Sequence, residues 1–111
     1  MNKDDKVFLR HILESIGYIE EDTYQINEES FLKNRQIQDV VVRRFEIIGE
    51  AANNISKETK KNFSDVAWSD IIGMRNNLIH EYFGIDLETV WDSVQNDLPK
   101  LKEQVVRMLE K

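Results

Sequence analysis

Hydrophobic residues recur every three or four positions along most of the chain, which is the spacing of one face of an α-helix. The first such stripe ends near Glu20 and contains Phe8, Leu9, Ile12, Leu13, Ile16 and Ile19. We expect Asp4 or Asp5 to cap this helix, because a carboxylate there can accept hydrogen bonds from the first turn. Residues 23–29 mix polar and apolar side chains and predict a connection.

The longest periodic segment runs from Phe31 to Ile55. Asn27 or Ser30 is its predicted cap, and the poorer phase near Asn34 leaves an interruption open. Gly49 costs about 1 kcal/mol relative to Ala inside a helix. We therefore expect Gly49 to mark a close contact with a neighbouring element. The apolar positions of this segment are Ile37, Val41, Phe45, Ile48, Ala52 and Ile55.

The C-terminal half predicts two further helices. Residues 57–64 are polar and predict a loop, and the next helix then starts at one of three residues, Ser64, Asp65 or Ser69. The segment 84–86 predicts a stop followed by a cap, so that the last helix begins near Leu87. Pro99 lacks an amide proton and should kink or restart that last helix.

Composition fits an all-α fold of modest size. The chain has 111 residues, 41% of them hydrophobic, with four Gly and one Pro. We expect one domain, residues 1–111, folded as a four- to five-helix up-down bundle that a second copy would stabilise. No apolar run approaches the roughly 20 residues that cross a bilayer, and the charged N-terminus lacks a secretory apolar segment. A cytoplasmic location is the expectation.

Residue counts also exclude several kinds of chemistry. The chain has no Cys and two His, His11 and His80. A cysteine nucleophile, a thiolate metal site and a His-rich metal cluster are therefore excluded. We expect no metal and no cofactor.

The net charge of −6 argues against strong nucleic-acid binding, since phosphates attract Lys and Arg. The distribution is uneven. Residues 1–29 carry three basic and eight acidic side chains, whereas residues 33–61 carry seven basic and four acidic ones. The middle segment could supply a local cationic surface, and any RNA binding should be weak and sensitive to salt.

The segment GMRNNLIHEYFG, residues 73–84, concentrates the candidate chemistry: a permanent cation at Arg75, a group that titrates near neutrality at His80, and a phenol at Tyr82. Arg75 lies on the apolar face of its predicted helix, where a guanidinium needs a partner or a route to water. One interpretation is a structural salt bridge to Glu46 or Glu50. The other is a phosphate-binding arginine at a cleft or subunit boundary.

The spacing of Arg75 and His80 is a second constraint. Five positions of a straight helix turn through about 140°. The two side chains can share one site only if the helix ends or distorts before His80, or if a second chain contributes.

Residues 75–82 resemble the Arg-x-x-x-x-His-x-Tyr signature of HepT-type toxins, which belong to the HEPN group (higher eukaryotes and prokaryotes nucleotide-binding). The similarity covers nearly the whole chain: residues 43–51 resemble a long helix of that family, residues 68–74 the approach to the motif, and residues 90–99 the last helix. The resemblance implies a homodimeric HEPN-type bundle and metal-independent RNA cleavage at a dimer cleft. It also implies a type II/VII toxin–antitoxin system, in which an MntA-type nucleotidyltransferase antitoxin transfers AMP onto the tyrosine, here Tyr82.

The residue types suit metal-free cleavage of RNA by its own 2′-hydroxyl. His80 could act as general base or acid. Arg75 could hold the phosphate and stabilise developing charge, and Asn76 could orient His80 or contact the phosphate. The predicted catalytic residues are therefore Arg75, His80 and Asn76. Supporting roles are expected on the long helix for Arg43, Glu46 and Glu50.

Two other functions stay open. The chain could be a catalytically inactive HEPN module that engages the nucleotidyltransferase, a reading that the acidic composition favours. It could also be a purely structural dimeric bundle, in which Arg75 is engaged by Glu46 or Glu50 and His80 is inaccessible.

Overall fold

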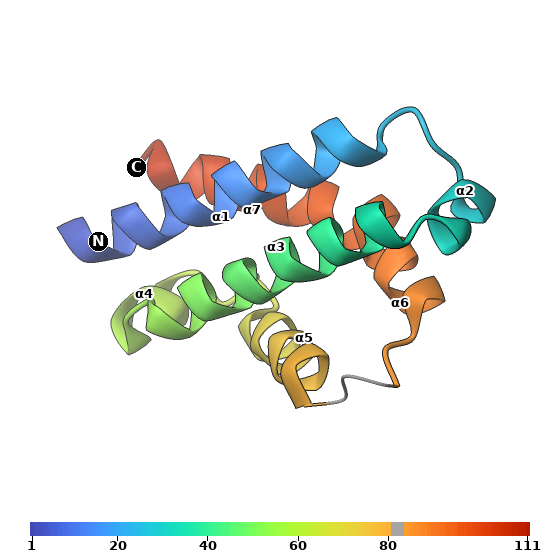
Figure 1. The fold of residues 1–111 in the computed structure, drawn as a ribbon. Helices are drawn as coiled ribbons and strands as arrows, with labels where there is room; N and C mark the ends of the chain where they lie inside the picture. Colours follow the sequence, from blue (N-terminus) through green and yellow to red (C-terminus); the bar gives the residue numbers. More distant parts are fainter. Residues whose placement is uncertain (81–83) are drawn as a thin grey trace.

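Every regular element in the described part of the chain is helical, which confirms the all-α prediction (Figure 1). The computed structural model describes residues 1–80 and 84–111, apart from the side chain of His80. No helix in these ranges is both long and apolar enough to cross a membrane. The elements are α1 (Lys3–Thr23), α2 (Glu28–Lys33), α3 (Arg35–Asn54), α4 (Lys57–Asn62), α5 (Trp68–His80), α6 (Leu87–Asp92), the π-helical segment η1 (Ser93–Asp97) and α7 (Leu98–Leu109).

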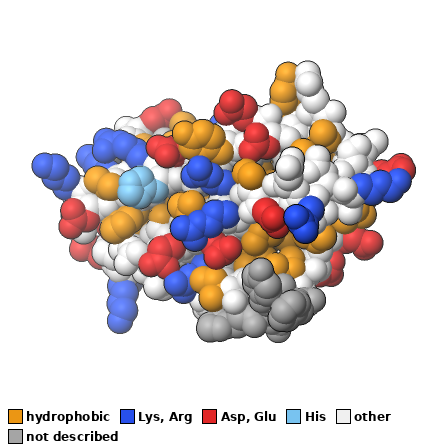
Figure 2. Space-filling model, viewed as in Figure 1, with side chains coloured by type: hydrophobic (Ala, Val, Ile, Leu, Met, Phe, Trp, Pro, Cys, Tyr) orange, Lys and Arg blue, Asp and Glu red, His pale blue; other side chains and the backbone are white. Residues whose placement is uncertain are grey.

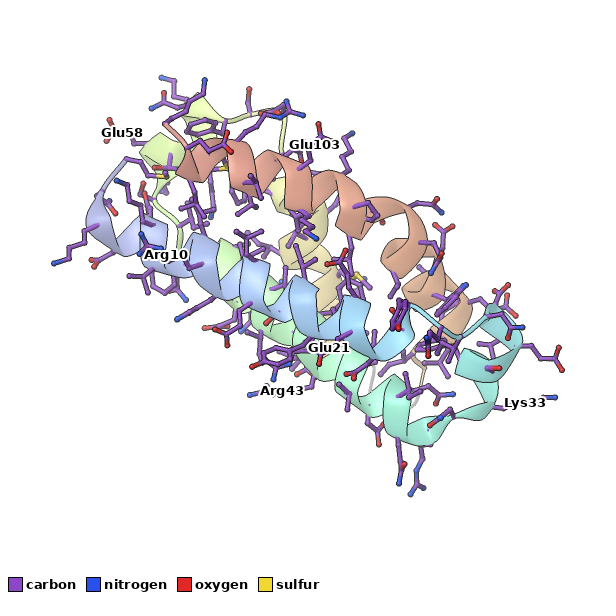
Figure 3. All side chains as sticks on the ribbon, turned by 90° about the horizontal axis from the view of Figure 1, so that it is seen from above. Arg10, Glu21, Lys33, Arg43, Glu58 and Glu103 are labelled. Atoms are coloured by element: carbon purple, nitrogen blue, oxygen red, sulfur yellow. The ribbon has the colours of Figure 1, made fainter. Side chains whose placement is uncertain are left out.

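Helix α3 is the centre of the bundle. It runs antiparallel to α1 and contacts both α1 and α5, while α7 returns along α1 so that the two chain ends lie at the same end of the molecule (Figure 1). The predicted stripes of α1 and α3 face this core: Leu9, Ile12, Ile16 and Ile19 of α1 and Val41, Phe45, Ile48 and Ala52 of α3 are buried. Viewed from above, α1 and α7 lie side by side, with polar side chains outside (Figure 3).

The cap of α1 differs from the prediction. Asn2 is the N-cap, and its Oδ1 accepts a hydrogen bond of 2.7 Å from the amide of Asp5. The helix therefore begins earlier than the positions of Asp4 and Asp5 suggested. Asp5 is only 1% exposed, and its carboxylate accepts hydrogen bonds from the amide and hydroxyl of Ser56 and from the hydroxyl of Thr59.

The interruption that the sequence left open near Asn34 is present. Asn34 ends α2 and also caps α3, where its Oδ1 accepts a hydrogen bond of 3.1 Å from the amide of Ile37. Asn27, rather than Ser30, caps α2. The periodic segment is thus two helices, because an asparagine side chain can replace the backbone acceptors that a helix start lacks.

The prediction of a loop over residues 57–64 is wrong. Residues Lys57–Asn62 form α4, which Ser56 caps through a hydrogen bond from the amide of Thr59. This polar turn lacks an apolar stripe of its own, and its anchor is the buried contact of Ser56 and Thr59 with Asp5 on α1. Helix α5 then begins at Trp68, so Ser64 and Asp65 are not its start and Ser69 already lies within it.

The C-terminal helical region has the two features that the sequence predicts. Asp86 caps α6 by accepting hydrogen bonds from the amides of Glu88 and Thr89, and hydrogen bonds from Thr89 lower the pKa of its carboxyl. Pro99 occupies the first turn of α7, immediately after the π-helical segment η1. Proline cannot donate a backbone hydrogen bond, so the regular α-helix is interrupted before it and starts again.

Candidate functional site

The contact between α3 and α5 is closest at Gly49 and Arg75. A Cβ atom built on Gly49 would lie 2.1 Å from the Cβ of Arg75 and 3.2 Å from the carbonyl oxygen of Ile71. Real Cβ atoms do not approach other atoms to 2.1 Å, so any larger residue would push α5 away. Gly49 therefore marks a close helix contact, as predicted. Arg75, whose close approach Gly49 permits, is the candidate phosphate ligand.

The Arg75 guanidinium bridges the two helices. Its Nη2 donates to Oε2 of Glu50 at 2.5 Å, and its Nη1 donates to Oδ1 of Asn76 at 2.9 Å. The Arg75 side chain is 26% exposed, and that of Glu50 is 55% exposed. Of the two predicted salt-bridge partners, Glu50 makes the contact, whereas Glu46 lies 3.9 Å from Arg43 on the same helix.

One donor of this guanidinium is not satisfied. The Nε atom of Arg75 is buried and, among the described residues, has no hydrogen-bond partner. A buried donor without an acceptor costs about 1–3 kcal/mol. Among the described residues, Arg75 is therefore held through two of its nitrogens, and the buried third nitrogen can reach an acceptor on a ligand only if the guanidinium moves.

A surface groove with a volume of about 380 Å³ surrounds this cluster, and we call it the Arg75 groove. It lies where α1, α3 and α5 meet, and Arg43 projects outward from α3 near it (Figure 3). The groove contains Arg75 together with all three predicted supporting residues. Its lining residues are Phe8, His11, Arg43, Glu46, Ile47, Glu50, Ala51, Asn54, Arg75 and Ile79.

Sequence reasoning missed the contribution of α1 to this groove. Phe8 and His11 both line it, and their rings meet edge to face with centroids 6.3 Å apart. His11 is exposed, and Figure 2 shows a histidine on this face among hydrophobic, basic and acidic side chains. The available signal was the i, i+3 spacing of the two residues, which places both on one side of α1.

The charges of the Arg75 groove nearly cancel. Arg43 and Arg75 face Glu46 and Glu50, and of the seven basic residues in segment 33–61 only Arg43 appears among the described lining residues. The predicted cationic surface is therefore not gathered here. Partly exposed ion pairs are typically worth only about 0–1 kcal/mol, so an incoming phosphate could replace Glu50 on Arg75 at small cost.

Two predicted site residues are not placed. Helix α5 continues through His80, so its backbone does not end before that residue. The His80 side chain and Tyr82 lie outside the described part of the structure. Within that part, no group of three or more His, Cys, Asp or Glu side chains could hold a metal ion.

A second pocket, of about 290 Å³, lies between α3, α5, η1 and α7. Apolar residues such as Phe45, Ile71 and Leu101 line it together with charged ones, and none of the predicted site residues that the structure describes lines it. We therefore take the Arg75 groove as the candidate site.

Comparison with known proteins gives a consistent family. The model of the "Ribonuclease HepT-like" family matches residues 12–108. The chain is 43% identical over 103 residues to "Putative RNase MJ1380" of Methanocaldococcus jannaschii, which covers 93% of this chain and 94% of that protein. It is 41% identical over 102 residues to "Probable ribonuclease HepT" of Thermococcus cleftensis, which covers 92% of this chain and 93% of that protein.

A longer relative shares the same region. The chain is 44% identical over 110 residues to "Gamma-glutamylcyclotransferase and putative RNase MJ0434" of Methanocaldococcus jannaschii, and 99% of this chain is covered. The chain spans 50% of the length of that relative. No solved structure matches the chain.

Proposed function

The chain belongs to the HepT-like ribonuclease family, and we propose that it is a metal-independent RNA endonuclease that acts as the toxin of a toxin–antitoxin system. The observation that carries this proposal is the position of Arg75. Gly49 admits it to the contact between α3 and α5, and its partly exposed guanidinium lines a groove in which its ion pair with Glu50 is open to an incoming anion. A phosphodiester supplies the oxygen acceptors that an arginine fork binds in pairs.

The proposed reaction is attack by the RNA 2′-hydroxyl on the neighbouring phosphorus. A base removes the hydroxyl proton, the new O–P bond forms, and the bond to the 5′-oxygen breaks as an acid protonates that oxygen. The products are a 2′,3′-cyclic phosphate and a 5′-hydroxyl. His80 is the proposed proton-transfer residue, Arg75 stabilises the charge on the phosphorane, and Asn76, which already accepts from Arg75, positions that guanidinium.

We propose that the active form is a homodimer. Each chain has one histidine in the motif, while the reaction needs a base and an acid. Because α5 is helical through His80, the five-residue spacing to Arg75 still corresponds to about 140° on a regular helix. A second chain would bring the complementary Arg75 and His80 to the same phosphodiester.

The proposed mechanism of inhibition is transfer of AMP to Tyr82 by an MntA-type nucleotidyltransferase antitoxin. The phenolic oxygen would attack the α-phosphorus of ATP, lose its proton and release pyrophosphate. The product places a bulky anion two residues from His80. Such a group would compete with RNA phosphate for Arg75 and repel the RNA backbone.

The decisive experiment compares wild type with His80→Ala in RNA cleavage assays that contain EDTA. We expect wild type to cleave and the variant to lose at least about 100-fold in rate, within the range for a general acid or base. Light scattering should show dimers for both proteins. Equal cleavage by the two proteins would remove His80 from the mechanism.

The modification is tested separately by mass spectrometry after incubation with the partner and ATP. Masses of added AMP should appear on wild type and be absent from Tyr82→Phe. Tyr18→Phe and Tyr24→Phe are matched controls, because these are the other two tyrosines of the chain. Persistence of the added mass in Tyr82→Phe would assign the acceptor elsewhere.

One observation favours the alternative, a catalytically inactive HEPN module that engages the nucleotidyltransferase. Glu50 is already paired with Arg75, and the two arginines among the described lining residues are balanced by two glutamates, which leaves no excess of positive charge there to attract RNA. Expression of the chain without its partner distinguishes the two functions. Growth arrest that requires Arg75 supports the ribonuclease, whereas tight partner binding without toxicity or RNA cleavage supports the module.

A further inference from the structure

The second histidine of the chain lies in the same groove as Arg75. His11 comes from α1, far along the chain from the motif of residues 75–82. It lines the Arg75 groove together with residues of α3 and α5. Its ring is exposed, while the Phe8 ring meets it edge to face at an interplanar angle of 81°. The groove thus has a guanidinium on one wall and an aromatic pair on another.

We propose that His11 is the stacking platform for an unpaired nucleobase of the RNA, a subsite that rests on the proposed ribonuclease function and defines its substrate. A base on the His11 ring would have its backbone beside Arg75 and Arg43, which line the same groove. Bases inside a duplex keep their faces stacked on one another. The substrate class is therefore single-stranded RNA, or RNA with a base that is unpaired at this position.

The surroundings of His11 fit stacking better than proton transfer. A catalytic imidazole is normally oriented by a hydrogen bond to its second nitrogen, and His11 has no hydrogen bond to any described residue. The charged groups that line the groove with it are Arg43, Glu46, Glu50 and Arg75, and both glutamates are nearest to arginines. The His11 ring instead contacts another aromatic ring, that of Phe8.

The size of the groove is suitable for this ligand. Small-molecule sites typically have volumes of about 300–1,000 Å³, and this groove has about 380 Å³. Ile79, which is 42% exposed, adds an apolar wall on α5. Base stacking on aromatic side chains tolerates any base, so we expect a requirement for unpaired RNA rather than for one sequence.

The test measures binding of a fluorescent single-stranded RNA whose 2′-hydroxyls are methylated, so that it cannot be cleaved by the proposed reaction. His11→Ala should weaken binding about 10-fold, within the range known for loss of one stacked base. His11→Phe keeps a ring but has no titratable nitrogen, and it should bind within about 2-fold of wild type, a margin much smaller than a stacking loss. Tyr24→Ala is the matched control, since Tyr24 is 75% exposed and does not line the groove.

The outcomes separate this subsite from the proposed function. Unchanged binding by His11→Ala, while Arg75→Ala loses binding, would overturn the subsite and leave the ribonuclease proposal standing. Equal defects in His11→Ala and His11→Phe would also overturn stacking and would assign the imidazole nitrogens a polar role. Equal binding of single-stranded and duplex RNA by wild type would contradict the requirement for an unpaired base. A wild type that neither binds nor cleaves RNA would end both proposals.

Discussion

Two polar clusters join distant parts of the chain, and they differ in burial and in how completely they are satisfied. In the first, the Asp5 carboxylate is 1% exposed and accepts three hydrogen bonds from Ser56 and Thr59, each 2.6–2.9 Å long. In the second, the Arg75 guanidinium is partly exposed, holds Glu50 and Asn76, and keeps a buried Nε without a described partner. The first cluster is closed to solvent, whereas the second is partly exposed, so that an incoming anion could replace Glu50 on Arg75.

The difference indicates which cluster stabilises the fold and which is available for function. Buried polar groups that are fully hydrogen-bonded rigidify a structure, and the Asp5 cluster fixes α4 against α1. A half-exposed ion pair contributes little to stability and exchanges partners readily. We therefore expect substitutions in the Arg75 cluster to change RNA cleavage and those in the Asp5 cluster to change unfolding.

The largest expected effect is that of Arg75→Ala on RNA cleavage. Loss of the charge that stabilises the phosphorane should lower kcat by at least about 100-fold, measured with saturating RNA. The free energy of unfolding should change by only about 1 kcal/mol, because the Glu50 pair is partly exposed. Arg107→Ala is the matched control, since Arg107 is ion-paired with Glu103 on α7 and lies outside the groove. An equal loss in both variants would contradict a specific role.

Asp5→Ala should produce the opposite pattern. Three donors of Ser56 and Thr59 would lose their acceptor, and we expect the free energy of unfolding to fall by about 2–3 kcal/mol. Urea titration measures it, and Asp4→Ala, an exposed neighbour in the same turn, is the control. Cleavage per folded molecule should be unchanged, and a selective loss of activity would show that the two clusters are coupled.

Gly49→Ala should lower both the stability of the fold and the rate of RNA cleavage, because it moves α5. The new Cβ clashes with the Cβ of Arg75, and overpacking of this kind costs about 1–3 kcal/mol, part of which helix propensity offsets. Differential scanning calorimetry should show a lower melting temperature together with reduced RNA cleavage. Gly17→Ala is a close control, because a Cβ there meets nothing within 4 Å, and it should stabilise the protein by up to about 1 kcal/mol.

The Asp5 cluster should also make the free energy of unfolding depend on pH in the acid range. Burial raises the pKa of the Asp5 carboxyl, but hydrogen bonds from Ser56 and Thr59 outweigh burial, and the net pKa lies below the ordinary value of 3.8. As pH falls, the unfolded chain therefore binds a proton at Asp5 before the folded protein does. The stabilisation is complete above about pH 3.8 and is lost as pH falls through the lower pKa of the folded state. Urea titrations over this range should show a weaker pH dependence for Asp5→Asn than for wild type.

The smallest expected change in stability is that of Glu50→Gln. The amide keeps a hydrogen-bond acceptor for Arg75 but removes the charge, and the free energy of unfolding should change by less than about 1 kcal/mol. Affinity for uncleavable RNA should rise several-fold in low salt, because the groove gains one positive charge. Glu103→Gln is the control on α7. Weaker RNA binding by Glu50→Gln would mean that Glu50 supports the RNA site rather than competing with phosphate.

Local sequence patterns predicted most of the helical framework. The period of three to four residues located the buried stripes of α1 and α3, which are confirmed as core. Asn34, Asp86 and Pro99 marked helix breaks correctly, because caps and proline act within a single turn of backbone. The loop predicted over residues 57–64 was wrong, since α4 is anchored by Asp5, more than 50 positions away.

The sequence by itself thus determined the helical class, the helix breaks near Asn34, Asp86 and Pro99, and the short segment that holds the candidate residues. Only the tertiary structure decided that Arg75 pairs with Glu50 instead of Glu46, that Gly49 makes this contact possible, and that His11 of α1 lines the same groove. The physical reason is distance along the chain. Helix periodicity and capping depend on neighbours within a few residues, whereas the partners of Arg75 are selected by how α1, α3 and α5 pack against one another.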